Sequence, residues 1–231
     1  MDNYRKIYTA RAKEYHQMIT PEDVDGNLLA ALQQIAPLEN TALLDLGSGT
    51  GRIPLLVDEI VSQLIALDLN LPMLLEQKYQ RQKVNGFWGL INGDNRELPF
   101  PDNFVDIVTV GWAIGHLRGW YERDWMIQIG KILTEMARVT KPGGHLMIME
   151  TLTTGALEPA PPSPRLAEYY AWLEETWGYT RRTIQTDYQF KNVDEAVAKT
   201  KFFFGPELAD KIRKNGWSRL PEWTGVWSKQ V

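Results

Sequence analysis

The chain has 231 residues, enough for one sizeable hydrophobic core, and its 44% hydrophobic and 23% charged residues are ordinary for a soluble globular protein. A formal net charge of −4 offers no basic surface to a nucleic-acid backbone, and no apolar run approaches the length of a membrane span. The absence of cysteine excludes disulfides and thiol nucleophiles. Three histidines leave no convincing zinc pattern, so we predict no bound metal.

The N-terminal segment is predicted to be helical. Two helices are expected, over residues 3–18 and 21–36, with Thr20 as the cap of the second and Pro21 at its first position. The first residues, from Met1 onward, lead into further charged positions without an apolar run, which indicates that no secretory signal is present. We therefore expect a cytoplasmic protein.

Strands and helices then alternate along the chain. The predicted strands span residues 42–46, 64–68, 87–91, 104–110 and 144–150, and the predicted helices between them span residues 52–61, 71–83 and 121–139. Strands separated by helices of this length form right-handed crossovers, which build a mostly parallel sheet with helices on both faces. We predict an α/β, Rossmann-like, doubly wound fold with a seven-stranded sheet.

The chain changes character after residue 150. A proline-rich connector over residues 159–164 cannot form a helix or an interior strand, and an aromatic segment that is predicted to be helical follows it. The aromatic residues of that segment have helical spacing, which is more typical of core packing than of a pocket. Helices are expected near 193–200 and at 206–215, and a closing strand at 223–227.

The most informative segment lies where the first strand ends. Gly47, Gly49 and Gly51 follow that strand at every second position, directly before a helical stretch. Glycines at such a turn allow positive φ and let a ligand approach where a Cβ would collide. Asp68 ends the second strand, where a carboxylate can accept both hydroxyls of a ribose. The pattern predicts a cofactor that contains a nucleoside.

The segment Asp-Leu-Gly-Ser-Gly-Thr-Gly, beginning at Asp45, resembles motif I of the class I S-adenosylmethionine (SAM)-dependent methyltransferases. Its spacing differs from the Gly-x-Gly-x-x-Gly of dinucleotide sites, and no Lys-Ser or Lys-Thr follows as in a Walker P-loop. Further segments resemble the same family in order and spacing, at 91–94 with 98–100, 104–108, 111–117 and 137–144. The likeness covers about residues 40–150 and is strongest to the small-molecule branch, methyltransferase type 11, which includes quinone-pathway C-methyltransferases.

The resemblance implies one methyltransferase domain over residues 1–231. Its expected parts are N-terminal helices at 1–36, a SAM-binding core at 40–150, a cap or substrate insertion at 151–190 and a C-terminal completion of the sheet at 191–231. The insertion follows a core strand, so we expect it to fold over the carboxyl edge of the sheet as a small helical and aromatic cap.

The resemblance also implies which residues contact SAM. The glycine turn would present backbone to the amino-acid part, Asp68 would hold the ribose hydroxyls, and Asp94 would contact the adenine amino group. Trp112 would flank the sulfonium, and Tyr15 would close over the cofactor. The full predicted set is Tyr15, Gly47, Ser48, Gly49, Thr50, Gly51, Asp68, Leu69, Met73, Gly93, Asp94, Asn95, Gly111 and Trp112.

Methyl transfer requires the acceptor to lie in line with the S–CH3 bond while water is excluded, and it requires a base only where the acceptor carries a proton. His116, just after the fourth strand, and Glu150, at the end of the fifth, are the candidates for that base. Each also has a structural explanation, because a histidine at such a place can cap a loop and a glutamate at a strand end is usually solvated or hydrogen-bonded.

Three other functions stay open. An RNA or protein acceptor is one, although the acidic balance argues against RNA, and residues 111–114 lack the Asn/Asp-Pro-Pro-aromatic motif of nucleobase methyltransferases. A nicotinamide-dependent oxidoreductase uses a similar sheet with another glycine spacing. A non-catalytic SAM-binding or partner-binding module would keep the same fold. We expect a small-molecule acceptor, no nucleic-acid partner, no membrane span, and a monomer or homodimer.

Overall fold

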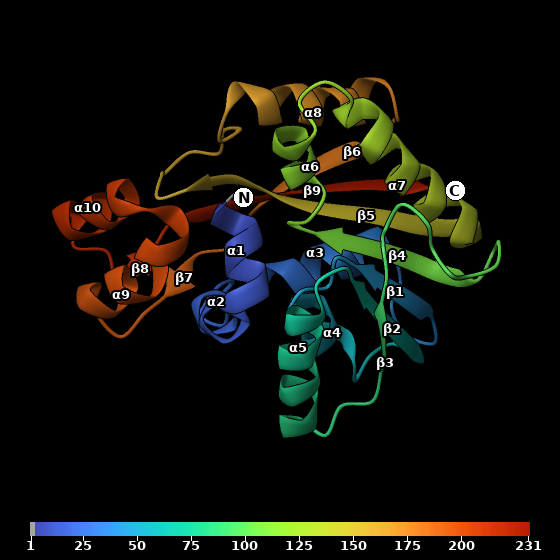
Figure 1. The fold of residues 1–231 in the computed structure, drawn as a ribbon, viewed down its shortest axis with the longest axis horizontal. Coiled ribbons are helices and arrows are strands. Elements are labelled where there is room, and N and C mark those ends of the chain that lie inside the picture. The colour runs from blue at the N-terminus through green and yellow to red at the C-terminus, as the bar shows by residue number, and fades with distance from the viewer. Residues whose placement is uncertain (1–2) are drawn as a thin grey trace.

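A seven-stranded sheet organises the protein, as the computed structural model of the chain describes it for residues 3–231 (Figure 1). The predicted lack of a secretory signal depends partly on residues 1–2, which lie outside the residues that the structure describes. The strands of the main sheet are β1 (Ala42–Leu46), β2 (Gln63–Asp68), β3 (Gly89–Asn92), β4 (Val105–Gly111), β5 (Thr140–Thr154), β6 (Thr180–Gln185) and β9 (Glu222–Gln230).

The strand order is β3-β2-β1-β4-β5-β9-β6. β1 to β5 are parallel to one another, and β9 pairs antiparallel with both β5 and β6, between which it lies. The order reverses at β1 and β4, and ligands of open α/β sheets bind at the carboxyl ends of strands beside such a switch. The structure therefore confirms the predicted doubly wound, mostly parallel sheet.

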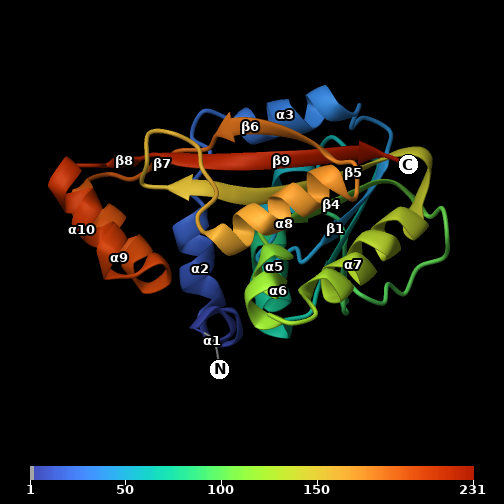
Figure 2. The same cartoon turned by 90° about the horizontal axis from the view of Figure 1, so that it is seen from above.

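Helices cover both faces of the sheet. They are α1 (Asn3–Ala10), α2 (Ala12–Ile19), α3 (Asn27–Ile35), α4 (Arg52–Val57), α5 (Leu71–Lys83), α6 (Gly115–Trp120), α7 (Trp125–Val139), α8 (Pro164–Glu175), α9 (Val193–Phe204) and α10 (Pro206–Asn215). α7 and α8 lie on one side of the central strands and α3 on the other (Figure 2). No described helix is long and apolar enough to cross a membrane.

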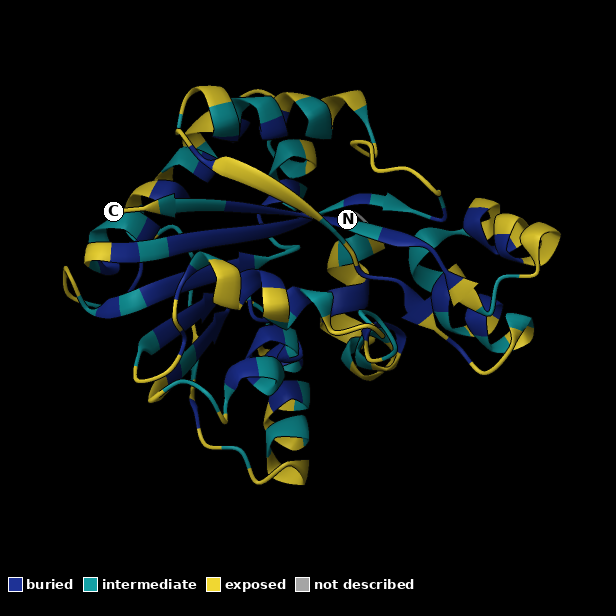
Figure 3. Ribbon diagram, turned by 180° about the vertical axis from the view of Figure 1, so that it is seen from behind, coloured by how far each residue is buried: buried dark blue, intermediate teal, exposed yellow. Residues whose placement is uncertain are grey.

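The core follows from the apolar spacing of these elements. The predicted stripe of α7 is buried along its whole length, at Trp125, Ile129, Ile132, Leu133, Met136 and Val139. α8 buries Tyr169, Tyr170 and Leu173 on the same side of the sheet, where the ring of Tyr170 lies 4.6 Å from that of Trp227 on β9. The central strands are buried and the edge strand β6 is exposed (Figure 3). The aromatic residues of α8 thus pack into the core.

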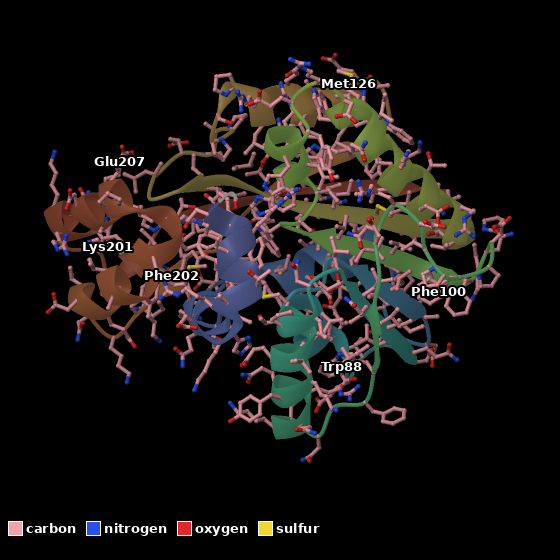
Figure 4. All side chains as sticks on the ribbon, in the orientation of Figure 1. Trp88, Phe100, Met126, Lys201, Phe202 and Glu207 are labelled. Carbon is pink, nitrogen blue, oxygen red and sulfur yellow. The ribbon has the colours of Figure 1, made fainter. Side chains whose placement is uncertain are left out.

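Residues 188–220 form a separate small body, here called the C-terminal lobe. It consists of α9, α10 and a two-stranded sheet of β7 (Tyr188–Gln189) and β8 (Arg219–Leu220). Its own apolar cluster includes Phe190, Ala209 and Ile212. The lobe lies beside α1 and α2 (Figure 1), and the guanidinium of Arg11 on the N-terminal segment lies 4.3 Å from the ring centre of Phe202, labelled in Figure 4.

The segment 151–190, which was expected to form a cap, contains α8 and β6. α8 packs on the face of the sheet, and β6 extends the edge of the sheet. Leu166 and Tyr170 of α8 line a cavity at the carboxyl end of β5 together with residues of α1, α2, α9 and α10. The division of the chain into the four predicted parts stays a prediction.

The second predicted helix was wrong at its start. α3 begins at Asn27, and Asp23, with φ of +60°, accepts hydrogen bonds from the amides of Asn27 and Leu28 at 2.9 and 3.0 Å. Glu22 turns inward, where it forms an ion pair with Arg52 at 2.8 Å. A helix cannot run on from Pro21, because the backbone of Asp23 lies in the left-handed region.

Candidate active site

The glycine turn between β1 and α4 has the backbone that its sequence predicts. Gly47, Gly49 and Gly51 have φ of +58°, +54° and +94°, a region that favours glycine. A Cβ at Gly47 would lie 2.6 Å from the Cβ of Ala113, so the turn also needs glycine for a close approach to the end of β4.

Gly47→Ala is expected to lower the free energy of unfolding by about 1–3 kcal/mol, since it adds backbone strain and a contact with Ala113. Gly143→Ala is the matched control, because Gly143 also has positive φ, +81°, but faces open space. Urea unfolding should show the larger loss at position 47. Equal losses at both positions would mean that backbone strain, and not the contact with Ala113, explains the effect at position 47.

Asp68 faces this turn from the end of β2. Its two carboxylate oxygens accept hydrogen bonds from the amides of Gly49 and Asn70, at 2.8 and 2.7 Å, and these bonds fix the orientation of the carboxyl group. Asp68 is buried, with 6% of the residue exposed. Burial raises the pKa of Asp68, and the backbone hydrogen bonds oppose that rise.

A cavity of about 430 Å³ opens in front of the turn, here called the first cavity. All predicted cofactor residues line it except two. Gly51 begins α4 and packs against Gln77, and Gly93 packs against Leu67. The predicted residues that the structure brings together here are Tyr15, Gly47, Ser48, Gly49, Thr50, Asp68, Leu69, Met73, Asp94, Asn95, Gly111 and Trp112.

Two arginines of the first cavity were missed by sequence reasoning. Arg96 binds the Asp94 carboxylate at 2.6 Å, and this hydrogen bond holds the pKa of Asp94 below its usual value. The guanidinium of Arg52 lies 3.7 Å from the ring centre of Trp112. The Trp112 backbone is in the left-handed region at φ of +50°, which is uncommon for a bulky residue. Arg52 therefore occupies one face of the ring that was predicted to flank the sulfonium.

A second cavity, of about 500 Å³, adjoins the first. The two share a partition that consists of Tyr8, Tyr15, Ile19, Arg52, Trp112 and His116. The other walls of the second cavity come from the carboxyl end of β5, from α8, and from α9 and α10 of the C-terminal lobe. The second cavity therefore lies beside the end of the first that Trp112 lines.

Both predicted base candidates line the second cavity. His116 Nε2 lies 2.8 Å from the hydroxyl of Tyr8, and its ring stacks on Trp120 with centres 5.2 Å apart. Glu150 Oε1 accepts a hydrogen bond from the amide of Gly115 at 2.8 Å. Burial raises the pKa of Glu150 to about 8, although the Gly115 hydrogen bond opposes this. Glu150 can therefore exchange a proton near neutral pH.

As the pH rises from 5 to 9, the free energy of unfolding of Glu150→Gln is expected to increase relative to that of the wild-type protein. A carboxyl with a pKa raised to about 8 contributes stability below its ordinary pKa, and that contribution is lost as the pH rises through 8. The change should be on the order of a few kcal/mol, in urea unfolding measured at several pH values. Asp45, whose pKa is also raised to about 8, contributes equally to both proteins. A pH-independent difference would contradict the prediction.

Comparison with known proteins gives a match in the centre of the chain. A family model described as "Methyltransferase domain" matches residues 44–148. The ubiquinone/menaquinone biosynthesis C-methyltransferase of Vibrio cholerae is 35% identical over 113 residues, 47% of this chain and 40% of that protein. The demethylmenaquinone methyltransferase of Lactiplantibacillus plantarum is 35% identical over 125 residues, 52% of this chain and 49% of that protein. The matches thus span about half the length of these curated relatives or less.

Solved structures share the fold along most of the chain. A SAM-dependent methyltransferase from Aquifex aeolicus superposes with a TM-score of 0.57 at 17% identity and covers 100% of both chains. The YcgJ protein of Bacillus subtilis gives a TM-score of 0.60 at 16% identity, over 90% of this chain and 99% of that one. At these identities the likeness is one of fold.

Proposed function

We propose that the chain is a class I SAM-dependent methyltransferase, as the match to a methyltransferase domain at residues 44–148 supports, and that it transfers a methyl group from SAM to a small-molecule acceptor. The observation that carries the proposal is the Asp68 carboxylate, buried and oriented by two backbone amides at the rim of the glycine turn, on the wall of the first cavity.

The first cavity fits the cofactor of this family. Asp68 Oδ2 accepts the Gly49 amide and keeps a lone pair for a ribose hydroxyl, whereas Oδ1 accepts the Asn70 amide and, at 3.4 Å, a long hydrogen bond from the Asn70 side chain that a ligand hydroxyl could replace. The buried Oδ1 of Asn95 has no partner within residues 3–231, which leaves an acceptor for a ligand N–H or O–H at the Asp94 end. Backbone at Gly47 and Gly49 leaves space that side chains would fill.

The residues of this chain would position and enclose the reacting groups. Tyr15 and Trp112 belong to both cavities, so they would hold the acceptor side of the cofactor and limit access of water. Glu150 or His116 would take a proton from the acceptor where it carries one. Bound SAM supplies an activated methyl group, so the protein's contribution is mostly alignment.

The curated relatives are named for ubiquinone and menaquinone biosynthesis, which makes a quinone precursor one candidate acceptor. RNA is a less favoured acceptor, since the chain has a net charge of −4. We propose that the protein acts in the cytoplasm on a small molecule.

Calorimetric titration of the purified protein with SAM and S-adenosylhomocysteine, with NAD as the control, tests the proposal. Micromolar binding of both adenosyl ligands and no binding of NAD is the expected result. Binding of NAD alone would favour an oxidoreductase. Tight adenosyl binding without transfer of labelled methyl groups to any pool of small molecules would favour a binding module.

A further inference from the structure

The second cavity is built mostly by parts of the chain outside the matched family region. Among its lining residues, those within 44–148 are Arg52, Trp112, Gly115 and His116. The remaining walls come from α1, α2, the end of β5, α8 and the C-terminal lobe. What this cavity binds must therefore be argued from its own side chains.

The charge balance of the second cavity leaves one buried carboxylate without a cation. Within the described part of the chain, Glu150 accepts one hydrogen bond, from Gly115, and forms no ion pair. The buried cation nearby, Arg52, is already paired with Glu22 at 2.8 Å. Lys211 and Glu207 lie on exposed positions of α10 and oppose each other in sign. A cationic ligand would favour the ionised form of Glu150 and supply the partner that this form lacks, whereas an anionic ligand would oppose ionisation of Glu150.

Aromatic rings form much of the remaining wall. Tyr4 and Tyr15 lie with their ring centres 5.0 and 5.6 Å from that of Phe203, so rings from both ends of the chain meet at this cavity. Tyr8 and Tyr170 complete the aromatic wall on the side towards Glu150. Aromatic faces attract ammonium groups and also pack against apolar rings and chains.

We propose that the second cavity binds the methyl acceptor and that this acceptor is an organic amine, whose protonated nitrogen pairs with the Glu150 carboxylate while its apolar part packs against the aromatic wall. This proposal rests on the proposed function, since it names the acceptor class of the same site. Glu150 would also take the proton that an ammonium group must lose before its nitrogen has a lone pair to accept a methyl group.

Three small molecules of one shape test the proposal: 2-phenylethylamine, 2-phenylethanol and 3-phenylpropionate, each titrated calorimetrically into the full chain saturated with S-adenosylhomocysteine. The amine should bind at least tenfold more tightly than the alcohol or the acid. Glu150→Gln should lose that preference, with the affinity for the amine falling at least tenfold and that for the alcohol unchanged. Glu39→Gln, at an exposed position that lines neither cavity, is the matched control and should keep the preference.

The outcomes separate this inference from the proposed function. If S-adenosylhomocysteine itself does not bind, the proposed function fails. If it binds but the alcohol matches the amine, if Glu150→Gln keeps the preference, or if none of the three molecules binds, the amine inference is overturned and the methyltransferase proposal stands. The comparison of the three molecules on wild-type protein keeps the inference testable even where Glu150→Gln fails to fold.

Discussion

Asp68→Asn is expected to weaken the binding of SAM and S-adenosylhomocysteine by about a hundredfold. Hydrogen bonds from ligand hydroxyls to a carboxylate contribute about 1.5–3 kcal/mol each, and two of them are worth about a hundredfold or more in affinity. The new amide group would also present N–H donors towards the backbone amide of Gly49 or Asn70, which now donate to the carboxylate. Calorimetry on both proteins measures the change.

Asp210→Asn is the matched control for that titration. Asp210 is an exposed aspartate on α10, 77% exposed in its side chain, and its loss should leave adenosyl binding unchanged. Unchanged affinity in a correctly folded Asp68→Asn protein would contradict the assignment of Asp68 to the ribose, and with it the observation on which the proposed function depends.

Glu22→Leu is expected to lower the free energy of unfolding by about 3 kcal/mol or more. Arg52 is largely buried, and although burial lowers its pKa, the Glu22 carboxylate raises that pKa above its usual value. Removal of the carboxylate would leave the guanidinium buried without a counter-charge, which costs about 3–5 kcal/mol. Urea unfolding at neutral pH measures the loss.

Two further variants identify the cause of that loss. The double variant Glu22→Leu with Arg52→Met removes both charges and should recover most of the stability. Asp210→Ala breaks an exposed ion pair with Arg213 and should cost less than about 1 kcal/mol. If the double variant were no more stable than Glu22→Leu, packing rather than the unpaired charge would explain the effect.

The sheet could be predicted because its signals are local. The strands at β1, β2 and β4 are short apolar runs, and α5 and α10 begin and end where the sequence places them. The glycine turn needs positive φ at Gly47, Gly49 and Gly51, so its conformation follows from residue type alone. Asp68 lies opposite that turn because parallel strands bring their carboxyl ends to one edge.

The missed elements depend on distant contacts. β6 is an exposed, polar edge strand whose pairing with β9 joins segments about 40 residues apart, so no apolar alternation marks it. α6 is a short helix that contains Gly119 and has weak propensity. Its position depends on the amide of Gly115, which donates to the buried Glu150 carboxylate from β5.

Most of the lining of the first cavity could be predicted from the sequence, and less of the second could. The first cavity is built around one local motif, whereas the second needs Glu22, Tyr8 and Phe203 to meet from both ends of the chain. The Arg52–Glu22 pair and the ring contact between Tyr15 and Phe203 are absent from any sequence pattern. Such contacts become visible only when the positions of α2 and the C-terminal lobe are known.

The partition between the two cavities has a consequence for how the proposed activity could change. The glycine turn and Asp68 lie at the ends of β1 and β2, whereas most walls of the second cavity belong to helices that precede β1 or follow β5. If the second cavity binds the acceptor, mutations in α1, α2, α9 or α10 should alter selectivity while the first cavity stays intact. Directed evolution aimed at new substrates should randomise those helices, at positions such as Phe203 and Leu208, and leave the strand ends as they are.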